Sequence, residues 1–453
     1  MKKREKAAFN WLARLLIFTI VVIAFNIFYW SHYSSLLIAP GNIIKSLIII
    51  DCSFFIAVAS IIAYKNLINP VSLYSLFIFL TGYSYIPLSN TQHLSYSYTT
   101  EIVLGASIVS FLAGCLLNRK VVRIKFRSLN KTAVRIIFTV ILSLSIAVFA
   151  LEIAKLGYIP IFNLLSGVNV YSETNDVLIP FAHYLVLFVA LVPAIAYAFF
   201  KEGKISRFLF LCVVIISAFV ILNFLSRQII LLLMLSLFYS YVYFNKISMT
   251  RTLSSAAIVV GMFIGIGSLR TGPNDVAGGV NEYLKAYAQI DKDVALLETY
   301  LTLYSSQNFT NLDKIVGDIN ENTKIGFGIY TFKPIISFLL LDRMGLVYYD
   351  PDYDGFMRLG TYVLDPFLDF SFPGVFLINF LLGFLCMNTY RSFTEKVNTQ
   401  SIINWSVLSF CIIMSAFTNF YDTFFIWFAL LLSIPLTNYK TKRANDIRLP
   451  SHP

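Results

Sequence analysis

The chain contains repeated apolar segments of the length that crosses a lipid bilayer. A hydrocarbon core of about 30 Å requires roughly 20 consecutive apolar residues in a helix. Twelve such segments occur, at about 10–30, 43–64, 69–88, 101–118, 133–154, 179–200, 207–223, 228–244, 252–269, 372–390, 403–419 and 421–438. Since 58% of the 453 residues are hydrophobic, only lipid or neighbouring helices can solvate most of the chain. The sequence therefore predicts an all-α polytopic integral membrane protein with about 12 transmembrane helices.

The basic residues indicate which side of the membrane each loop occupies, because lysine and arginine stay on the cytoplasmic side during insertion. With the N-terminus inside, 24 of the 35 lysines and arginines fall on the cytoplasmic side, most of them in the first residues, the loop 118–135 and the tail. We therefore expect both termini to be cytoplasmic. No A-x-A-like cleavage site follows the first apolar run, which predicts an uncleaved span. The net charge of +11 reflects this topology and gives no support for nucleic-acid binding.

The sequence contains no complete motif for a metal site, a disulfide framework or nucleotide binding. The five cysteines lie in predicted spans without a C-x-x-C pair, and the four histidines are scattered. The segment "DPDYDG" (350–355) matches the first half of a calcium loop, but Thr361 stands where a bidentate acidic ligand is needed. No P-loop or dinucleotide fingerprint is present. We therefore expect no metal and no cofactor, and a substrate that is already present at the outer face of the membrane.

One predicted outer loop is far longer than the others and is rich in acid. It covers 270–371 and holds 14 of the chain's 24 aspartates and glutamates. Apolar residues at steps of three and four through 282–306 predict one amphipathic helix in it. The apolar piece 335–347 is too short to span, and we expect a buried loop helix or a re-entrant element there. The predicted regions are helices one to nine (1–269), the large extracytoplasmic loop (270–371), helices ten to twelve (372–438) and a cytoplasmic tail (439–453).

Two local motifs and the overall architecture resemble one known family. The stretch "FLSRQIILLL" (224–233) contains a small residue followed by an arginine in a hairpin before a helix, Ser226 and Arg227. The stretch "LGTYVLDPFLDFSFPGVF" (359–376) has an Asp-Phe pair at the end of the outer loop, with Gly374 opening the next span. In these features the chain resembles the O-antigen polymerases, which are oligosaccharide repeat-unit polymerases of the Wzy type. It has D-F-S-F-P-G where D-F-G is commoner in that family.

The resemblance implies a membrane glycosyltransferase with a GT-C-like helix bundle, working without a metal. Such an enzyme moves a growing glycan from one undecaprenyl diphosphate carrier onto the terminal sugar of a second lipid-linked repeat unit. The product would be O-antigen or another surface polysaccharide, made at the outer face of a bacterial cytoplasmic (inner) membrane. The implied partners are undecaprenyl-diphosphate-linked oligosaccharides, membrane lipids, and the chain-length regulator and flippase of the same pathway.

Three kinds of side chain suit this reaction. Guanidinium groups bind phosphate oxygens in a bidentate way, and the arginines predicted on the outer side are Arg227, Arg270, Arg343 and Arg358. An attacking hydroxyl needs a general base, for which the loop offers Asp354, Asp365 and Asp369. Aromatic rings bind the apolar faces of sugars, and the glycan-binding candidates are Tyr349, Tyr353 and Tyr362.

The arginines also have structural explanations. Arg227 and Arg270 stand at the ends of predicted spans, where an arginine can reach the lipid headgroups. Arg343 directly follows an aspartate in an apolar segment, which is equally consistent with a structural ion pair. Arg358 lies between the acidic cluster and the Asp-Phe pair, a position that favours a functional role.

Ionisable residues inside predicted spans form a second group of candidates. Asp51 lies midway through "SLIIIDCSFFI", and an acid at that depth is a functional candidate by default. Lys45 and Glu152 are nearer to span ends, and we expect both to be interface anchors.

Three other functions are compatible with a large helical membrane protein of this kind. An O-antigen ligase shares the bundle and the outer loop, but the resemblance to ligases would require a histidine in that loop, and 270–371 contains none. A lipid-linked oligosaccharide flippase, which is a transporter, is expected to have two pseudo-repeated halves and short loops. The hundred-residue loop argues against that class. A scaffold or regulator of polysaccharide export is the third alternative.

Overall fold

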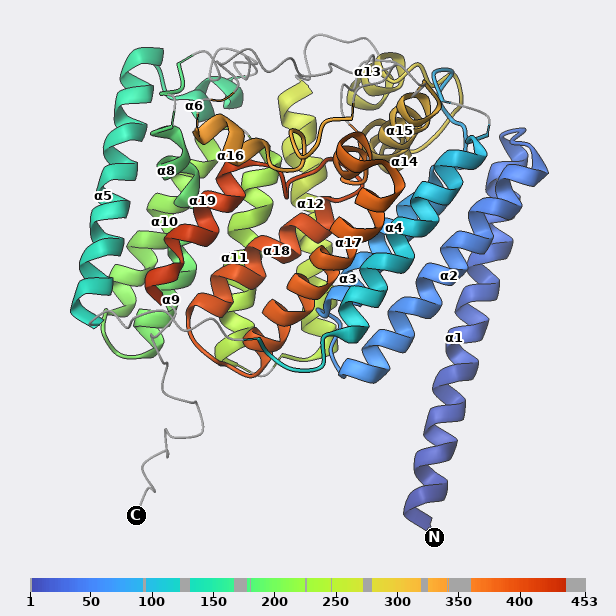
Figure 1. Cartoon of the computed structure of the whole chain (residues 1–453), viewed down its shortest axis with the longest axis horizontal. Coiled ribbons are helices and arrows are strands. Elements are labelled where there is room, and N and C mark those ends of the chain that lie inside the picture. The colour runs from blue at the N-terminus through green and yellow to red at the C-terminus, as the bar shows by residue number, and fades with distance from the viewer. Residues whose placement is uncertain are drawn as a thin grey trace.

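The structure is a computed structural model, shown in Figure 1, and its regular elements are helices. It describes residues 2–92, 95–122, 131–166, 177–179, 181–224, 226–245, 247–271, 279–318, 325–339, 341 and 360–436. Within these ranges the only β-type pairing is an isolated antiparallel bridge between Ser89 and Ile290. The predicted all-α class is confirmed for the described part of the chain.

The helices have the following bounds: α1 (Lys2–Ser35), α2 (Pro40–Tyr64), α3 (Pro70–Tyr83), α4 (Tyr98–Leu117), α5 (Lys131–Leu156), α6 (Pro160–Leu165), α8 (His183–Phe188), α9 (Val192–Lys201), α10 (Arg207–Asn223), α11 (Arg227–Phe244), α12 (Met249–Thr271), α13 (Gly279–Tyr287), α14 (Leu296–Leu301), the π-helix η1 (Thr302–Ser306), α15 (Gln307–Asp318), α16 (Lys333–Phe338), α17 (Leu364–Thr394), α18 (Gln400–Met414), α19 (Phe424–Leu432) and the 3₁₀ turn η3 (Ile434–Leu436).

The helices have the length, composition and surface of a helical membrane protein. Among the described residues, five helices are long and apolar enough to cross a membrane, namely α2, α4, α5, α11 and α17. Large apolar side chains also face outward along the bundle, and Leu116, Phe208, Ile215 and Phe376 are each more than half exposed. Such a surface is unfavourable in water and suits contact with lipid.

Most of the predicted apolar segments coincide with single helices, but the sixth, 179–200, is divided. It forms α8 and α9, which are separated by a turn at 189–191. Pro193 stands in the first turn of α9, where its missing N–H is tolerated. The proline therefore favours a new helix start at this point over one continuous helix.

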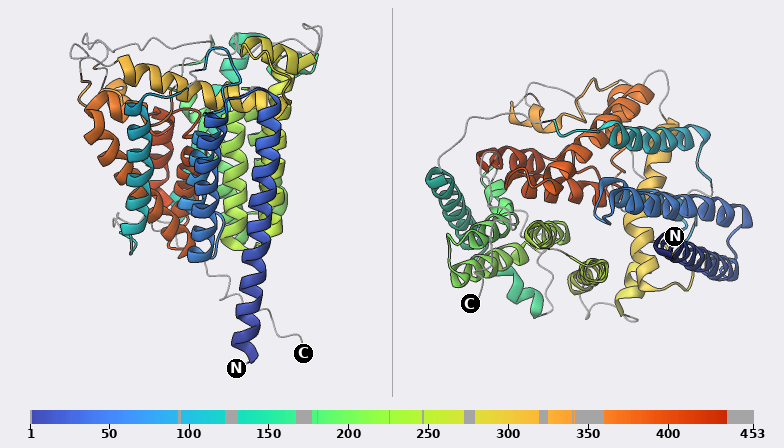
Figure 2. Two further views of the ribbon diagram at one scale, coloured as in Figure 1. Left: turned by 90° about the vertical axis from the view of Figure 1, so that its right-hand side faces the viewer. Right: turned by 90° about the horizontal axis from the view of Figure 1, so that it is seen from below.

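The bundle helices run between two distinct ends (Figures 1 and 2). The N-terminal end of α1 lies at one end, and α13, α14, α15 and α16 lie at the other, which we call the loop face. In the left view of Figure 2, the gold segment α14–η1–α15 lies across the ends of the bundle helices. The long loop thus contributes a helical layer at this end.

The predicted single amphipathic helix over 282–306 is wrong. The helix α13 ends at Tyr287, and Gln289 has a positive φ of 52° that breaks the helical path before α14. The break is held by the α3–α4 connection, since Ser89 Oγ donates to the carbonyl of Ala288 and the amide of Asn90 donates to the carbonyl of Gln289. Tertiary hydrogen bonds therefore override the local apolar periodicity here.

The start of α17 is set apart from the rest of that helix by a kink at Ser371. This residue has φ 54° and ψ −146°, a conformation that interrupts the helix, and Pro373 removes a backbone donor just after it. Gly374 has no room for a side chain, because a Cβ would contact the carbonyl of Pro366. The sequence D-F-S-F-P-G thus turns the segment 364–370 away from the span predicted to begin at 372.

The helices α4 and α17 pack with their backbones in close contact through two glycines. A Cβ on Gly114 of α4 would clash with the carbonyl oxygen of Phe380, and a Cβ on Gly383 of α17 would clash with that of Phe111. Small residues allow such close approach between apolar helices. This contact ties α17 to the bundle immediately below the kinked segment.

We expect Gly114→Ala to lower the free energy of unfolding by about 1–3 kcal/mol, because the added methyl group forces α4 and α17 apart. Chemical unfolding of the purified protein in detergent micelles measures the change. Gly105→Ala is the matched control, since Gly105 is on the same helix and has nothing within 4 Å of the position that a Cβ would occupy. Equal stability of the two variants would show that the close α4–α17 contact is not formed.

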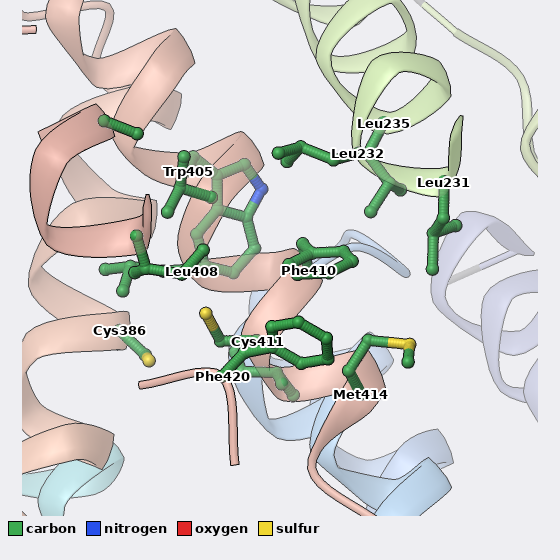
Figure 3. Packing of buried hydrophobic residues seen from close by; sticks show 14 of the residues in the cluster. Leu231, Leu232, Leu235, Cys386, Trp405, Leu408, Phe410, Cys411, Met414 and Phe420 are labelled. Carbon is green, nitrogen blue, oxygen red and sulfur yellow. The ribbon is translucent and has the colours of Figure 1, made fainter. Parts of the chain in front are cut away.

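The helix α18 is the centre of the hydrophobic core and fixes the segment that follows it. Figure 3 shows Trp405, Phe410 and Cys411 of α18 among Leu232 of α11 and Cys386 of α17. All five of these side chains are fully buried. Because α18 is packed on several sides, the connection 415–423 that leads from it to α19 has a defined position.

Candidate functional site

Three parts of the chain meet at the loop face: the connection 415–423, the kinked start of α17 and the segment α14–η1–α15. The amide of Tyr362 donates to the carbonyl of Ser415 over 3.1 Å. On the other side, Asn308 Nδ2 donates to the carbonyl of Phe417 over 2.6 Å. The connection 415–423 therefore links the two parts of the long loop that carry the polar groups described below.

A pair of carboxyls lies at this junction. Asp365 and Asp422 are hydrogen bonded to each other, and Asn419 Nδ2 donates to Asp365 Oδ2 over 2.7 Å. The exposed Lys333, at the start of α16, lies close enough to stabilise the ionised forms of both acids. Two adjacent carboxyls cannot both ionise easily, so the pair favours a state with one shared proton. We call these four residues the acid-pair cluster.

Asp422 lies in the turn before α19, beside Asp365 at the start of α17. In a carboxyl pair that shares one proton, one member donates a hydrogen bond while the other is available to accept a proton.

Asp369 has a positioning role and does not lie open to a substrate. Its side chain is fully buried, with Oδ1 accepting from the amide of Tyr330 over 3.1 Å and Oδ2 accepting from the amide of Thr331 over 2.6 Å. The backbone of 326–327 also bonds to that of 368–369. Asp369 thereby holds the segment that presents Lys333 to the acid pair.

Tyr362 is part of the core and has no surface for a sugar ring. It is 1% exposed, and its hydroxyl lies 2.7 Å from that of Tyr74 and 2.9 Å from Oγ of Ser107. Its ring packs edge-on against Phe77. We therefore reassign Tyr362 from glycan binding to the packing of α3, α4 and the start of α17.

Arg227 is held by two tyrosines of the loop. Its Nη2 donates to the hydroxyl of Tyr304 over 3.1 Å, and its Cζ lies 5.1 Å from the ring centroid of Tyr304 and 5.5 Å from that of Tyr300. Arg227 is the first residue of α11, where the helix dipole is positive and a cation is unfavourable. Cation–π contacts offset part of this cost. A bound anion would be favourable beside both the guanidinium and the helix N-terminus.

The π-helix η1 follows Tyr300 and brings polar groups into the interior. The side chains of Ser305, Ser306 and Asn308 are fully buried. Ser305 Oγ, Ser306 Oγ, Asn308 Oδ1 and the Tyr300 hydroxyl find no hydrogen-bond partner in the described ranges. Single π-turns are frequent at functional sites, and buried polar atoms without partners need water or a ligand.

A carboxylate anchors this segment to the bundle. Glu298 Oε1 accepts from the hydroxyl of Tyr33 over 2.8 Å and lies 2.9 Å from His32 Nε2. Its Oε2 accepts from the amide of Ala295 at the start of α14. Glu298 therefore fixes the beginning of α14 against α1 and so positions Tyr300 and Tyr304 one and two turns further on.

Several predicted site residues lie outside the described part of the structure. Arg270 is in the last turn of α12, but its side chain is not among those described. The residues outside the described ranges are Arg343, Asp354, Arg358, Tyr349 and Tyr353, together with the calcium-loop-like segment 350–355. Their roles stay predictions.

Two charged residues predicted as interface anchors have specific partners. Glu152 is 3% exposed, with Oε1 3.1 Å from His183 Nδ1 and accepting from the amide of Ile179, so its assignment as an anchor is wrong. Lys45 forms a 3.0 Å ion pair with Glu101. Burial of Glu152 requires such partners, because an isolated charge in the bundle would be costly.

Asp51 also has a partner, because Asn26 Nδ2 donates to its Oδ2 over 2.9 Å. This pair joins α1 to α2.

No protein-family model, curated protein or solved structure matches this chain. The function must therefore be argued from the site itself. In the described part of the chain, no three His, Cys, Asp or Glu side chains are grouped as metal ligands. The chemical groups that the site does offer are a carboxyl pair, an arginine beside a helix N-terminus and buried hydroxyls.

Sequence reasoning missed Asp422, Asn419 and Lys333. Asp422 had a signal, since it is an acid at the edge of an apolar segment, and such acids are functional candidates. Asn419 and Lys333 had none, because a polar residue at the end of an apolar segment or in a loop is usually solvated. Only their approach to Asp365 distinguishes them.

Proposed function

We propose that this protein is a membrane glycosyltransferase that polymerises undecaprenyl-diphosphate-linked oligosaccharide repeat units into a surface polysaccharide such as O-antigen. The observation that carries the proposal is the junction at the loop face, where a carboxyl pair and a tyrosine-held arginine are linked through the connection 415–423. A base and a cation on one junction are what glycan transfer from a diphosphate carrier requires.

In the proposed reaction, Asp365 accepts the proton of the acceptor hydroxyl as the oxygen attacks the anomeric carbon of the donor. A new glycosidic C–O bond forms, and the bond from the anomeric carbon to the diphosphate oxygen breaks. Asp422 and Asn419 hold Asp365 in place through hydrogen bonds. The leaving diphosphate carries the negative charge, which Arg227 stabilises by donating hydrogen bonds. Arg270, Arg343 and Arg358 are further candidates for the diphosphate.

In the proposed topology, twelve segments of the chain span an inner membrane, both termini are in the cytoplasm and the loop face is outside. In the proposed pathway, a flippase supplies the lipid-linked repeat units and a chain-length regulator sets the extent of polymerisation.

Deletion of the protein in its native host tests the proposal. We expect gel analysis of surface polysaccharide to show lipid A core with a single repeat unit, because unpolymerised units are still ligated. Complementation with the wild-type chain should restore the ladder of longer products. Complete loss of attached repeats would indicate the alternative functions of ligase or flippase, and an unchanged ladder would exclude all three.

A further inference from the structure

A cavity with a basic lining lies at the opposite end of the bundle from the loop face. Its volume is about 440 Å³, and it lies where α2, α11 and α17 end. The charged residues that line it are Lys65, Arg391 and Lys396, with Glu395 as the one carboxylate. The lining therefore has an excess of positive charge.

Arg391 lines this cavity and has one side-chain donor without a partner among the described residues. Its Nη1 donates to the carbonyl of Arg119 over 3.1 Å, whereas its Nε is buried and finds no hydrogen-bond partner within the described residues. Lys396 lies in the connection after α17, with its Nζ 5.5 Å from the ring centroid of Tyr243. The lining therefore contains cations, and the described residues do not satisfy every donor of the Arg391 guanidinium.

A second, apolar cavity lies beside the first. It has a volume of about 1010 Å³ between α3, α11 and α12, and its lining includes Leu73, Leu235 and Val259. The two cavities are lined by adjacent residues of the same segments, since 64–66 line the basic one and 67–68 the apolar one. On α11, Tyr241 lines the apolar cavity and the next two residues line the basic one.

Basic residues are also common at helix C-termini, where the helix dipole is negative. That tendency is a sufficient reason for Lys65, which directly follows α2. It does not account for the buried Nε of Arg391 or for a large apolar cavity next to the cations. A ligand with an anionic head and a long apolar chain accounts for both.

We propose that these cavities form a binding site for an anionic membrane phospholipid, with its phosphate in the basic cavity and an acyl chain in the apolar one. Guanidinium and ammonium groups bind phosphate oxygens, and the apolar lining removes the chain from contact with other lipids. The site lies away from the acid-pair cluster, and the proposal is independent of the proposed function.

Native mass spectrometry of the full-length protein in detergent tests this proposal, with phosphatidylglycerol and phosphatidylcholine added at equal concentrations. We expect preferential retention of phosphatidylglycerol, and a loss of about tenfold or more in its retention for Arg391→Gln and for Lys396→Gln. Lys396 is exposed, so its substitution should leave the fold intact. Arg207→Gln, an exposed arginine at the start of α10, is the matched control and should retain the lipid like the wild type.

Two further measurements separate a lipid from a soluble phosphate. Leu235→Trp, which fills part of the apolar cavity, should reduce phosphatidylglycerol retention as well, and free glycerol phosphate should not displace the lipid. Wild-type retention by both Arg391→Gln and Lys396→Gln would overturn the proposal. Displacement of phosphatidylglycerol by an equal concentration of glycerol phosphate would also overturn it, because the site would then bind the phosphate without the chain.

Discussion

Asp365→Asn is expected to reduce glycan polymerisation by about 10²- to 10⁴-fold, the usual contribution of a general base. The substitution keeps the size of the side chain and its contact with Asn419 but removes the group that accepts a proton. The measurement is the length distribution of polysaccharide in a deletion strain that expresses the variant. In vesicles, the same variant should accumulate lipid-linked single repeat units.

Asp369→Asn and Asp422→Asn are the comparisons for this experiment. Asp422→Asn keeps a hydrogen-bond donor beside Asp365 and should retain more activity than Asp365→Asn. Asp369→Asn disturbs the amides of Tyr330 and Thr331, so we expect it to act through stability. Full-length polymer from an Asp365→Asn protein expressed at the wild-type level would show that Asp365 is not the base.

Arg227→Ala is expected to reduce polymerisation by about 10- to 100-fold, because each hydrogen bond to a charged group contributes roughly 1.5–3 kcal/mol. Arg227→Lys should have an intermediate effect, since an ammonium keeps the charge but loses the bidentate geometry. Initial rates with purified lipid-linked repeat units measure both variants. The loss should appear mainly in the transfer rate, where the diphosphate gains charge as it leaves.

Tyr304→Phe is the matched control for Arg227. It removes the 3.1 Å hydrogen bond but keeps the ring beneath the guanidinium, so we expect only a modest loss of activity. Arg270→Ala tests the second predicted diphosphate ligand. If Arg227→Ala and Arg270→Ala both produce full-length polymer at normal expression, a diphosphate-binding role for these arginines is excluded.

The placement of Arg227 and Asp365 next to apolar segments was predictable from the sequence, and their binding and catalytic roles stay predictions. Arg227 stands between two apolar segments joined by a very short hairpin, and α10 and α11 indeed end and begin at Asn223 and Arg227. Asp365 precedes an apolar span at the end of an acidic loop. Sequence position alone does not separate site residues from core residues in this stretch. Tyr362 and Asp369 come from the same stretch as Asp365, and both are buried.

The sequence by itself determined the helical class, the apolar segments and the position of the long loop. These properties depend on hydrophobicity along the chain, and the cost of placing a polar backbone in an apolar environment leaves helices as the favourable solution. Local sequence also determined the kink at Ser371, because Pro373 and Gly374 act on their own backbone.

Only the tertiary structure decided which polar groups meet. Asn419 and Lys333 approach Asp365 from distant parts of the chain. The predicted amphipathic helix is broken at Gln289, next to Ala288, whose carbonyl accepts a hydrogen bond from Ser89 Oγ. The two cavities at the other end depend equally on where α2, α11 and α17 end relative to one another. Such contacts depend on how whole helices pack against one another, and the local sequence around each contact residue does not specify that packing.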